Sequence, residues 1–396
     1  MKTIYADNNA TTAVAPEVIA AMMPYFKEEY FNPSSMYEAS RAAADAIARA
    51  RSAVGRLLNA GDARQILFTS CATESNNAAI IGAAKANPRR HIVTTSVEHP
   101  AVLEVCKELA RSGYDVTFLP VDSNGKLDVR DFVRALSSDT LLVTIMHSNN
   151  ETGVIFPVDE LSRLTKETDP SIVFHTDATQ SVGKLPIDLR GALRYVDMLS
   201  LSGHKMHAPK GVGALFIRRG TPCRPFMIGG HQEDGRRAGT ENVPYIVGLG
   251  KACELAQSHR DDQERVSRLR DRLQSALEER IPYLEVNGGG APRLPNTVNV
   301  ACHYIEGEGI LYQLSSHGIC ASSGSACTSG SLEPSHVLKA MNVPFTAVHG
   351  SVRFSLSRYS TDEDVDRIIE VFPEIVHNLR RLSPYWDSAN ARPRAD

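Results

Sequence analysis

The sequence lacks the features that mark membrane-spanning, secreted and nucleic-acid-binding proteins. No apolar run approaches the roughly 20 residues that a membrane-spanning helix needs. Residues 1–7 lead directly into strand-like sequence, so we expect no signal peptide. The formal net charge of −3 provides no basic surface for a nucleic acid or an anionic membrane. We therefore expect neither a nucleic acid nor a membrane as a partner.

Paired cysteines are absent as well. The seven cysteines are an odd number and show no CxxC spacing, which argues against a disulfide framework and against a zinc site. Cys106, Cys253 and Cys302 lie in apolar or amphipathic segments, as packing cysteines do. This cysteine usage indicates a reducing compartment, and we expect a cytoplasmic protein with no stably bound metal.

One cysteine differs from the others in its surroundings. Cys327 lies within residues 323–329, which read SGSACTS and contain nothing with apolar bulk to bury. Small polar residues of this kind favour a mobile, solvent-facing loop, in which a thiol can ionise and react. By itself, a string of this composition more often contains an ordinary loop cysteine. The interpretation of Cys327 as a reactive thiol depends on a lysine site far upstream, at Lys205.

The chain has 396 residues, of which 42% are hydrophobic, and is long enough for two or three domains. In its first two thirds, short apolar segments rich in β-branched residues alternate with amphipathic segments. This alternation predicts an α/β fold with a mostly parallel, seven-stranded sheet. The predicted strands are 66–69, 91–95, 116–119, 141–145, 172–175, 198–201 and 213–217. In such a sheet the chemistry gathers at the carboxyl ends of the strands.

A change of pattern predicts where the domains divide. A long, charged amphipathic helix is expected over residues 259–280, and a smaller α+β region follows it. We expect a large domain at residues 15–258. Residues 1–14 and 259–396 are expected to form a small domain that carries the loop of Cys327.

A lysine and an aspartate follow two consecutive predicted strands. Lys205 ends the string Ser202-Gly203-His204-Lys205, and Asp177 ends the strand before it. Taken singly, such a lysine is usually a surface amine, and such an aspartate usually caps a turn. Adjacent parallel strands would bring both to one edge of the sheet. The pair then suits pyridoxal phosphate, which needs a lysine for a Schiff base and an acid for its pyridine nitrogen. Lys210, in a Pro-Lys-Gly turn, is the alternative lysine.

Two further strand ends supply candidates for holding that cofactor. Residues 69–75 follow a strand and open a helix, and a helix N-terminus binds phosphate through its free N–H groups. Thr73 could equally be a plain N-cap. His99 precedes Pro100, which suits the first turn of a helix. His99 either caps or packs there, or it stacks on the cofactor ring and moves protons.

Together these strings resemble the fold-type I (class V aminotransferase-like) pyridoxal phosphate enzymes and, within them, the NifS/IscS family of cysteine desulfurases. The resemblance covers nearly the whole chain and is closest to the nitrogen-fixation (NifS) type. The strings that carry it stand, in order, at residues 7–12, 72–75, 98–99, 149–153, 177–180, 202–205, 237–240, 322–333 and 352–355.

The resemblance implies a role for each matching residue. Lys205 would carry the Schiff base, Asp177 would pair with the pyridinium nitrogen, and Cys327 would accept the sulfur. Arg353 would grip the substrate carboxylate through a bidentate pair. The remaining implied contacts are these: Gln180 to the ring hydroxyl, His99 above the ring, Asn150 to cofactor and substrate, and Ala72, Thr73, Ser202 and His204 to the phosphate, with Thr240 arriving from the other subunit of a homodimer.

The implied reaction turns L-cysteine into L-alanine. Lys205 would remove the α-proton, and the Cys327 thiolate would attack the substrate sulfur and keep it as a persulfide. His99 is the candidate for taking the thiol proton. The sulfur would pass to an iron–sulfur scaffold of the NifU type for nitrogenase, and Cys327 would meet a cluster only on that partner.

Several alternatives stay open from the sequence. One is a housekeeping desulfurase that supplies iron–sulfur clusters and thio-cofactors, and another is a selenocysteine lyase. An aminotransferase would have no use for Cys327, and a catalytically idle scaffold would have no use for Lys205. Two positions depart from many relatives: Cys71 stands where glycine is common, and Asp234 lies in a loop that is often more basic. We expect Cys71 to alter the backbone freedom beside the phosphate.

Overall fold

The large core is built on one sheet of seven strands. The computed structural model describes residues 3–323, 334–387 and 389–394. The sheet has the order β2-β8-β7-β6-β5-β3-β4. Its strands are Ile66–Thr69 (β2), His91–Thr95 (β3), Asp115–Leu119 (β4), Thr140–Thr144 (β5), Val173–Asp177 (β6), Met198–Ser202 (β7) and Gly213–Ile217 (β8). β8 runs antiparallel to both of its neighbours, and the other pairs from β7 to β4 are parallel. The predicted mostly parallel, seven-stranded sheet is therefore confirmed.

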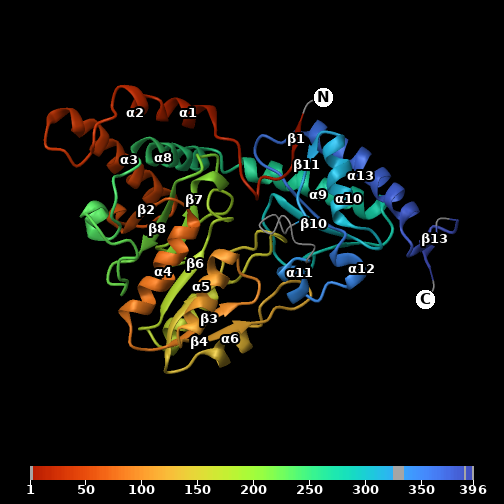
Figure 1. Cartoon of the computed structure of the whole chain (residues 1–396), viewed down its shortest axis with the longest axis horizontal. Coiled ribbons are helices and arrows are strands. Elements are labelled where there is room, and N and C mark those ends of the chain that lie inside the picture. Colours follow the sequence, from red (N-terminus) through yellow and green to blue (C-terminus); the bar gives the residue numbers. More distant parts are fainter. Residues whose placement is uncertain (1–2, 324–333, 388, 395–396) are drawn as a thin grey trace.

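The alternation of side chains along the strands covers both faces of this sheet. One face packs on α4 (Ala72–Ala86) and α5 (Pro100–Arg111), which lie in front of the sheet in Figure 1. The other face packs on helices that include α3 (Arg41–Leu57) and α8 (Val243–Ser258). Leu67 belongs to the first face, and its neighbours Ile66 and Phe68 belong to the second. This period of two lets one short apolar strand fill two cores.

The remaining helices of this part are shorter. They are α1 (Pro16–Met22), α2 (Pro24–Lys27), α6 (Val129–Ala135) and α7 (Val158–Thr168), with 3₁₀ turns at Glu38–Ser40, Ala63–Gln65, Gly203–Lys205 and Gln232–Gly235. α3 crosses α8 closely because small residues meet there. A Cβ atom added to Gly250 would lie 2.7 Å from the Cα and Cβ atoms of Ala50. Glycine is therefore required at this crossing.

A second core lies beside the first. It is built on an antiparallel sheet of β9 (Leu284–Val286), β10 (Thr297–Cys302) and β12 (Ser351–Ser355), in the order β12-β10-β9. The helices packed with it are α9 (Asp262–Arg280), α10 (Gly307–Ser316) and α13 (Asp362–Leu382). A capping box between Thr361 and Asp364 starts α13. The short strands of this part are β11 (Ile319–Cys320), β13 (Trp386–Asp387) and β14 (Arg392–Pro393). The short helices α11 (His336–Ala340) and α12 (Phe345–Val348) follow in the same stretch of chain, but their buried side chains Val337, Leu338 and Val348 pack in the first core.

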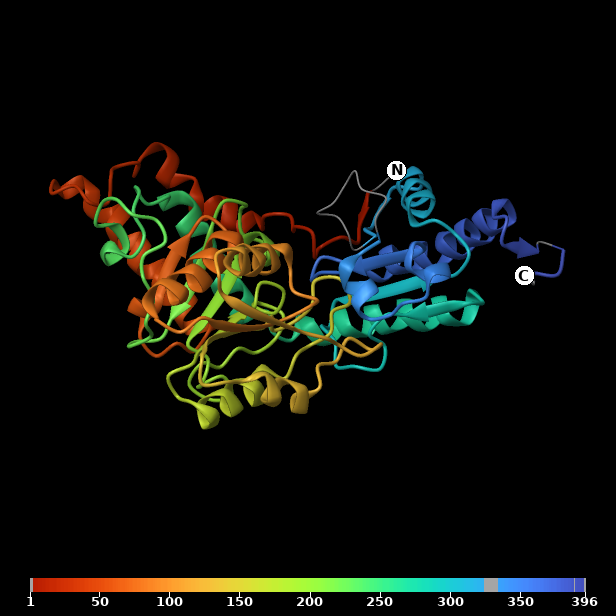
Figure 2. The ribbon, with the colours of Figure 1, turned by 60° about the horizontal axis from the view of Figure 1, so that its bottom comes forward.

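The start of the chain joins the two cores. β1 (Ile4–Tyr5) pairs in parallel with β11, and the side chains of Ile4 and Ala6 are buried in the second core. The chain then crosses to the first core, where α1 begins at Pro16 (Figure 2). Residues 7–12 therefore pass between the two cores, beside the carboxyl ends of β6 and β7. Within the described residues, no helix combines the length and the apolar character that a membrane span requires.

Candidate active site

A cavity of about 330 Å³ lies at the carboxyl ends of the parallel strands. It collects all but two of the residues that the sequence analysis selected: Ala72, Thr73, His99, Asn150, Asp177, Gln180, Ser202, His204, Lys205 and Arg353. The parallel sheet explains this convergence, because β3, β6 and β7 all end at the same edge. Arg353 comes from β12 of the second core, so both cores contribute to the cavity.

Asp177 presents a carboxylate that is held by two donors. The backbone N–H of Thr179 donates to Oδ1 at 2.9 Å, and Asn76 Nδ2 donates to Oδ2 at 2.7 Å. The aspartate is 7% exposed, and Asn76 is completely buried on α4. Both donors fix the position of the carboxylate in the cavity, where a ring nitrogen can pair with it.

Lys205 stands on the 3₁₀ turn that follows β7. Its Nζ atom donates to the backbone carbonyls of Asn9 and Ala10, each at 2.7 Å. These carbonyls belong to the segment that crosses between the two cores. The amine therefore lies in the cavity against backbone from the start of the chain.

His99 is the N-cap of α5. Its Nδ1 atom accepts a hydrogen bond from the Ala101 N–H at 3.1 Å. Burial lowers the pKa of His99, and the nearby charge of Asp177 opposes that shift. A neutral imidazole that accepts at Nδ1 carries its proton on Nε2. In this arrangement His99 is a hydrogen-bond donor through Nε2, and it can accept a proton only after the bond to Ala101 opens.

The N-terminus of α4 forms one wall of the cavity. Cys71 is the N-cap residue, and no side chain caps the helix there, so N–H groups of the first turn are available to an anion. Cys71 has φ −174° and ψ 173°, an extended conformation open to any residue. Cys71 therefore adopts its observed conformation without strain, and the expected change of backbone freedom beside the phosphate stays a prediction. The glycine that this region needs is Gly213, where an added Cβ would lie 2.8 Å from the carbonyl carbon of Cys71.

His204 adds a neutral group to the same wall. Its Nδ1 atom lies 3.1 Å from Thr11 Oγ1, within hydrogen-bond distance. Burial, reinforced by the charge of Lys205, lowers the pKa of His204 to about 4. His204 is consequently neutral at physiological pH in this structure, and its imidazole can offer a phosphate a hydrogen bond.

Unpartnered polar atoms test whether this cavity suits pyridoxal phosphate. Among the described residues, four side chains that line the cavity hold a buried atom without a hydrogen-bond partner: Asn76 Oδ1, Thr179 Oγ1, Ser202 Oγ and Arg353 Nε. Buried polar atoms are normally satisfied, so such a cluster indicates room for a polar ligand. The free first turn of α4, the lysine and the carboxylate match the phosphate, the aldehyde and the pyridine nitrogen of that cofactor. The residues fit the group.

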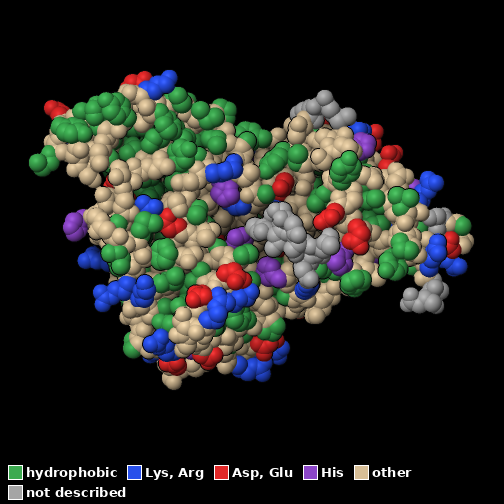
Figure 3. All heavy atoms as spheres, viewed as in Figure 1, with side chains coloured by type: hydrophobic (Ala, Val, Ile, Leu, Met, Phe, Trp, Pro, Cys, Tyr) green, Lys and Arg blue, Asp and Glu red, His purple; other side chains and the backbone are tan. Residues whose placement is uncertain are grey.

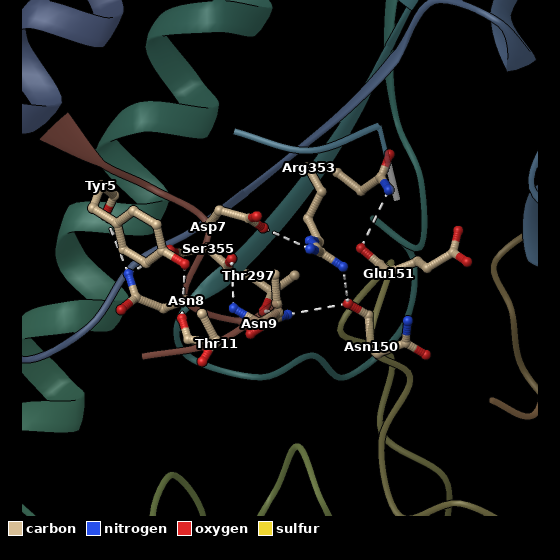
Figure 4. A network of polar contacts seen from close by, with 12 residues as sticks. Tyr5, Asp7, Asn8, Asn9, Thr11, Asn150, Glu151, Thr297, Arg353 and Ser355 are labelled. Carbon is tan, nitrogen blue, oxygen red and sulfur yellow. Dashed lines mark hydrogen bonds and ion pairs between the residues drawn. The ribbon is translucent and has the colours of Figure 1, made fainter. Parts of the chain in front are cut away.

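The Arg353 side chain is held by the segment between the cores, as Figure 4 shows. Its Nη2 atom is 2.6 Å from Asp7 Oδ1, and its Nη1 atom donates to the Asn150 carbonyl at 2.9 Å. The residue is only 2% exposed. Two of the three guanidinium nitrogens are thus engaged by protein, and Nε remains for a ligand.

Gln180 is buried, and its Nε2 atom donates to the Asn9 carbonyl at 3.0 Å. Asn9 therefore contacts Gln180 and Lys205 through one oxygen. Its side-chain Nδ2 atom reaches the Asn150 carbonyl and the Thr297 hydroxyl (Figure 4). Asn9 thus contacts Thr297 of β10 and three residues that line the cavity, which are Asn150, Gln180 and Lys205.

Two of the selected residues do not line this cavity. Thr240 is exposed and borders a separate hollow of about 160 Å³. Its loop is tied to the first turn of α4 by an ion pair between Arg237 and Glu74 at 2.9 Å. Cys327 lies outside the described residues.

The chain that follows the undescribed segment is attached close to the cavity. Ser335 donates to the buried carboxylate of Glu151 at 2.5 Å and also caps α11. His336 Nε2 lies 2.9 Å from the carbonyl oxygen of Glu98. Both partners are direct neighbours of selected residues, since Glu151 follows Asn150 and Glu98 precedes His99.

Reasoning from the sequence missed several residues of the site. Asp7, Asn9 and Asn76 hold Arg353, Lys205 and Asp177. Asp7 and Asn9 belong to a string that carried the family resemblance, but nothing local gives them a partner. Asn76 lies one helical turn after Thr73, which places it on the same face of α4. That spacing was the available signal.

Known proteins similar to this chain agree with the features of the site described above. The model of the aminotransferase class-V family matches residues 4–368. A cysteine desulfurase of Nostoc sp. is 56% identical over 387 residues, which are 97% of this chain and 96% of that protein. The cysteine desulfurase NifS of Azotobacter vinelandii is 53% identical over 388 residues, 98% and 96% of the two chains. A solved NifS-like protein superposes with a TM-score of 0.88 at 38% identity, covering 96% of this chain and all (100%) of that one.

Proposed function

The chain belongs to the class-V aminotransferase family and, within it, to the pyridoxal-phosphate-dependent cysteine desulfurases, and we propose that it converts L-cysteine to L-alanine with Cys327 as the first sulfur acceptor. One observation carries this proposal: Lys205, Asp177 and Arg353 line a single cavity. A lysine and an acid suit the cofactor, and a buried arginine suits the carboxylate of an amino acid.

We assign the cofactor contacts as follows. Asp177 pairs with the ring nitrogen, Gln180 donates to the ring oxygen, and His99 stacks on the ring. Ala72, Thr73, Ser202 and His204 hold the phosphate. The unpartnered hydroxyl of Ser202 supports this assignment, as does the uncapped start of α4. When bound, pyridoxal phosphate supplies an electron sink for the charge that develops at the substrate Cα atom.

The substrate carboxylate is assigned to Arg353, beside Asn150. Nε and one Nη atom of a guanidinium present two parallel N–H bonds, which match the two oxygens of a carboxylate. The Asn150 carbonyl and Asp7 each accept from one of the two Nη atoms, so the orientation of the group is set before substrate arrives. Each Nη atom keeps a second N–H, which is available for the bidentate pair. Such preorganisation limits the entropy that binding costs.

The protein then moves protons and sulfur. The amine of Lys205 would take the proton from the substrate Cα atom, and a proton would be delivered to Cβ as alanine forms. The Cys327 thiolate attacks the substrate sulfur, so an S–S bond forms and the Cβ–S bond breaks. The transferred sulfur is oxidised to the persulfide level and Cβ is reduced by the same electron pair, and no outside oxidant is needed. His99 can accept the thiol proton once its Nδ1 bond to Ala101 opens.

The exposed surface supports a homodimer in which Thr240 completes the phosphate site of the other subunit. Large apolar side chains are exposed along residues 19–37, among them Ile19, Phe26, Tyr30 and Met36. In Figure 3, hydrophobic side chains gather over the region of α1 and α2. An apolar patch of this kind typically marks a protein interface. The exposed Thr240 is available to a partner, while its loop is anchored through Arg237.

We further propose a cytoplasmic enzyme that delivers sulfur to a NifU-like iron–sulfur scaffold for nitrogenase. The similarity to the Azotobacter NifS protein supports this role. A housekeeping supply of sulfur to clusters and thio-cofactors is the second candidate. Selenocysteine lyase activity is the third, because the same pocket would accept selenium in place of sulfur.

The test is an absorbance scan combined with sulfide release from L-cysteine. We expect wild type to show a band near about 400 nm, as a lysine-bound cofactor does, and to form sulfide and alanine. Cys327→Ala is expected to keep the band and lose sulfide release, and Lys205→Ala is expected to lose both. Full activity of Cys327→Ala would overturn the desulfurase assignment. A wild-type protein that binds no pyridoxal phosphate would overturn the whole proposal.

A further inference from the structure

Lys184 stands behind the proposed cofactor site and has no part in the reaction described above. It lies in the turn after β6 and is half-buried. Its Nζ atom donates to Gln180 Oε1 at 2.9 Å and, more weakly, to Asn9 Oδ1 at 3.5 Å. Both acceptors are side-chain amide oxygens, and within the described residues neither of these bonds goes to a carboxylate. An ammonium placed against neutral amides is unusual enough to require an explanation.

The contacts of Lys184 determine which way the Gln180 amide faces. An ammonium group has donors and no acceptor, so it can bind the amide oxygen but not the amide nitrogen. The nitrogen end of Gln180 is independently assigned, because it faces the Asn9 carbonyl. The two contacts agree, and Gln180 therefore offers N–H groups on the side away from Lys184.

Asn9 is oriented in the same manner. Its Nδ2 atom donates to Asn150 and Thr297 (Figure 4). Its Oδ1 atom is left to accept from Lys184 and from Asn296 Nδ2, the latter at 3.0 Å. The Asn9 carbonyl, in turn, holds both Gln180 and Lys205. Lys184 is thus linked to the proposed Schiff-base lysine through one intervening residue.

Charge connects the two lysines as well. Burial lowers the pKa of Lys184 to about 7, and the positive charges of Lys205 and Arg353 add to that shift. Lys184 and Lys205 also border a second, smaller cavity of about 40 Å³. Its other ionisable residues are His207, His259 and Arg358, and no acidic side chain is among the described residues that line it. Along this smaller cavity, no described carboxylate offsets the charge that protonated Lys184 places near Lys205; the carboxylate of Asp177 shares the larger cavity with Lys205.

We propose that Lys184 is a positioning residue of the cofactor site: it holds the Gln180 amide with its nitrogen toward the ring oxygen and disfavours a second positive charge at Lys205. The ring oxygen accepts hydrogen bonds. If the Gln180 amide were rotated by half a turn, its oxygen would face the ring oxygen, and two acceptors would repel each other. A cation near Lys205 favours the uncharged form of any nitrogen bound there. This inference rests on the proposed function.

The test is a pH titration of the visible absorbance of the holoenzyme without substrate. Lys184→Met keeps the length of the side chain and removes the charge and the donors. The midpoint of the absorbance titration of this variant is expected to rise by about one pH unit relative to wild type, because a positive charge near Lys205 has been removed. Lys85→Met, which replaces an exposed lysine near the end of α4, is the matched control and is expected to titrate as wild type does.

A second pair of variants tests the route through Gln180. The shift caused by Lys184→Met is expected to be smaller in a Gln180→Leu background than in wild type, since part of the effect passes through that amide. A shift of full size in both backgrounds would overturn the positioning role. If Lys184→Met does not fold, Lys184→Gln replaces it with the same expected rise.

The outcomes separate this inference from the proposed function. A wild-type holoenzyme with a titrating band, together with a Lys184 variant whose curve superimposes on it, overturns the role of Lys184 alone. A wild-type protein without any such band overturns the proposed function itself. Steady-state kinetics add a further readout: kcat is expected to fall, while KM for L-cysteine stays within about twofold, because Arg353 keeps its contacts.

Discussion

Arg353 Nη2 lies 2.6 Å from Asp7 Oδ1, so an arginine near the end of the chain is held by an aspartate at its start. The arginine belongs to β12 of the second core, and Asp7 to the segment that crosses toward the first. The pair is well shielded, with side-chain exposures of 2% and 18%. A buried guanidinium needs such a partner, because an unpaired buried charge is strongly destabilising. The contact therefore orients Arg353 and joins the two cores.

Replacing Asp7 tests this orientation. Asp7→Ala is expected to raise KM for L-cysteine about tenfold with little change of kcat, because one charge-assisted hydrogen bond, about 1.5–3 kcal/mol, no longer holds Arg353. Asp7→Asn keeps an acceptor and is expected to show a smaller rise. Steady-state sulfide release measures both variants. An unchanged KM in Asp7→Ala would show that Arg353 does not depend on the pair.

Asn76 is expected to act through Asp177. Asn76→Ala removes one of the two donors to the carboxylate and should lower kcat/KM about tenfold, the value of a single hydrogen bond to a charged group. Asp177→Asn should cost far more, since an amide cannot hold a proton on the ring nitrogen. An equal loss of kcat/KM in the two variants would contradict the inference that Asn76 acts only through Asp177. The absorbance of each holoenzyme checks that the cofactor is still bound.

Glu98 should make the stability of the protein depend on pH. Burial raises its pKa to about 8, although hydrogen bonds from Met146 and Thr95 favour the charged form. The folded protein then holds a proton that the unfolded chain, with a pKa near 4.5, has released, so stability falls as pH rises between these values. Glu98→Gln lacks this titration and keeps an acceptor oxygen.

The comparison for Glu98 is made by chemical unfolding at pH 5 and at pH 8. The gain in stability of Glu98→Gln over wild type is expected to be larger at pH 8, where the charged form would be most abundant. Taking the difference between the two proteins cancels the titration of all other groups. An equal gain at both pH values would mean that Glu98 titrates normally.

Ser335 joins the chain after the undescribed segment to the site. Ser335→Ala removes the hydrogen bond to Glu151 and the cap of α11, and we expect a loss of about 2 kcal/mol in the free energy of unfolding. Ser335→Thr keeps the hydroxyl and serves as the matched control. Thermal unfolding of both holoenzymes measures the difference. Identical midpoints for the two variants would contradict the role of the hydroxyl.

Local pattern was sufficient for much of this protein. Most of the seven strands were predictable because a buried strand is a short apolar run; β4, whose residues are mostly exposed or half-buried, shows instead the β-branched residues Val116 and Thr117. Lys205 and Asp177 were predictable because each directly follows such a run, and the ends of adjacent parallel strands must meet. Thr73 and His99 were predictable for the same reason, because each follows the end of a predicted strand. Each of these inferences needs only sequence neighbours and the geometry of one sheet.

The tertiary structure decided what holds those residues. Asp7 and Arg353 are separated by nearly the whole chain, and no periodicity joins them. Asn9 touches Lys205, Gln180, Thr297 and Asn150 because residues 7–12 cross between two cores, and that path depends on the pairing of β1 with β11. The close approach of β8 to Cys71 is likewise tertiary, since it requires that Gly213 lack a side chain.

The division has a physical basis. Backbone conformation and burial follow mainly from residues close in sequence, so a chain records them locally as runs, periods and caps. Hydrogen bonds between side chains form only after distant segments have packed, and their partners are selected by geometry rather than by order along the chain. Lys184 and Asp7 carry no local signal for that reason, although each lies beside a residue that the sequence identifies.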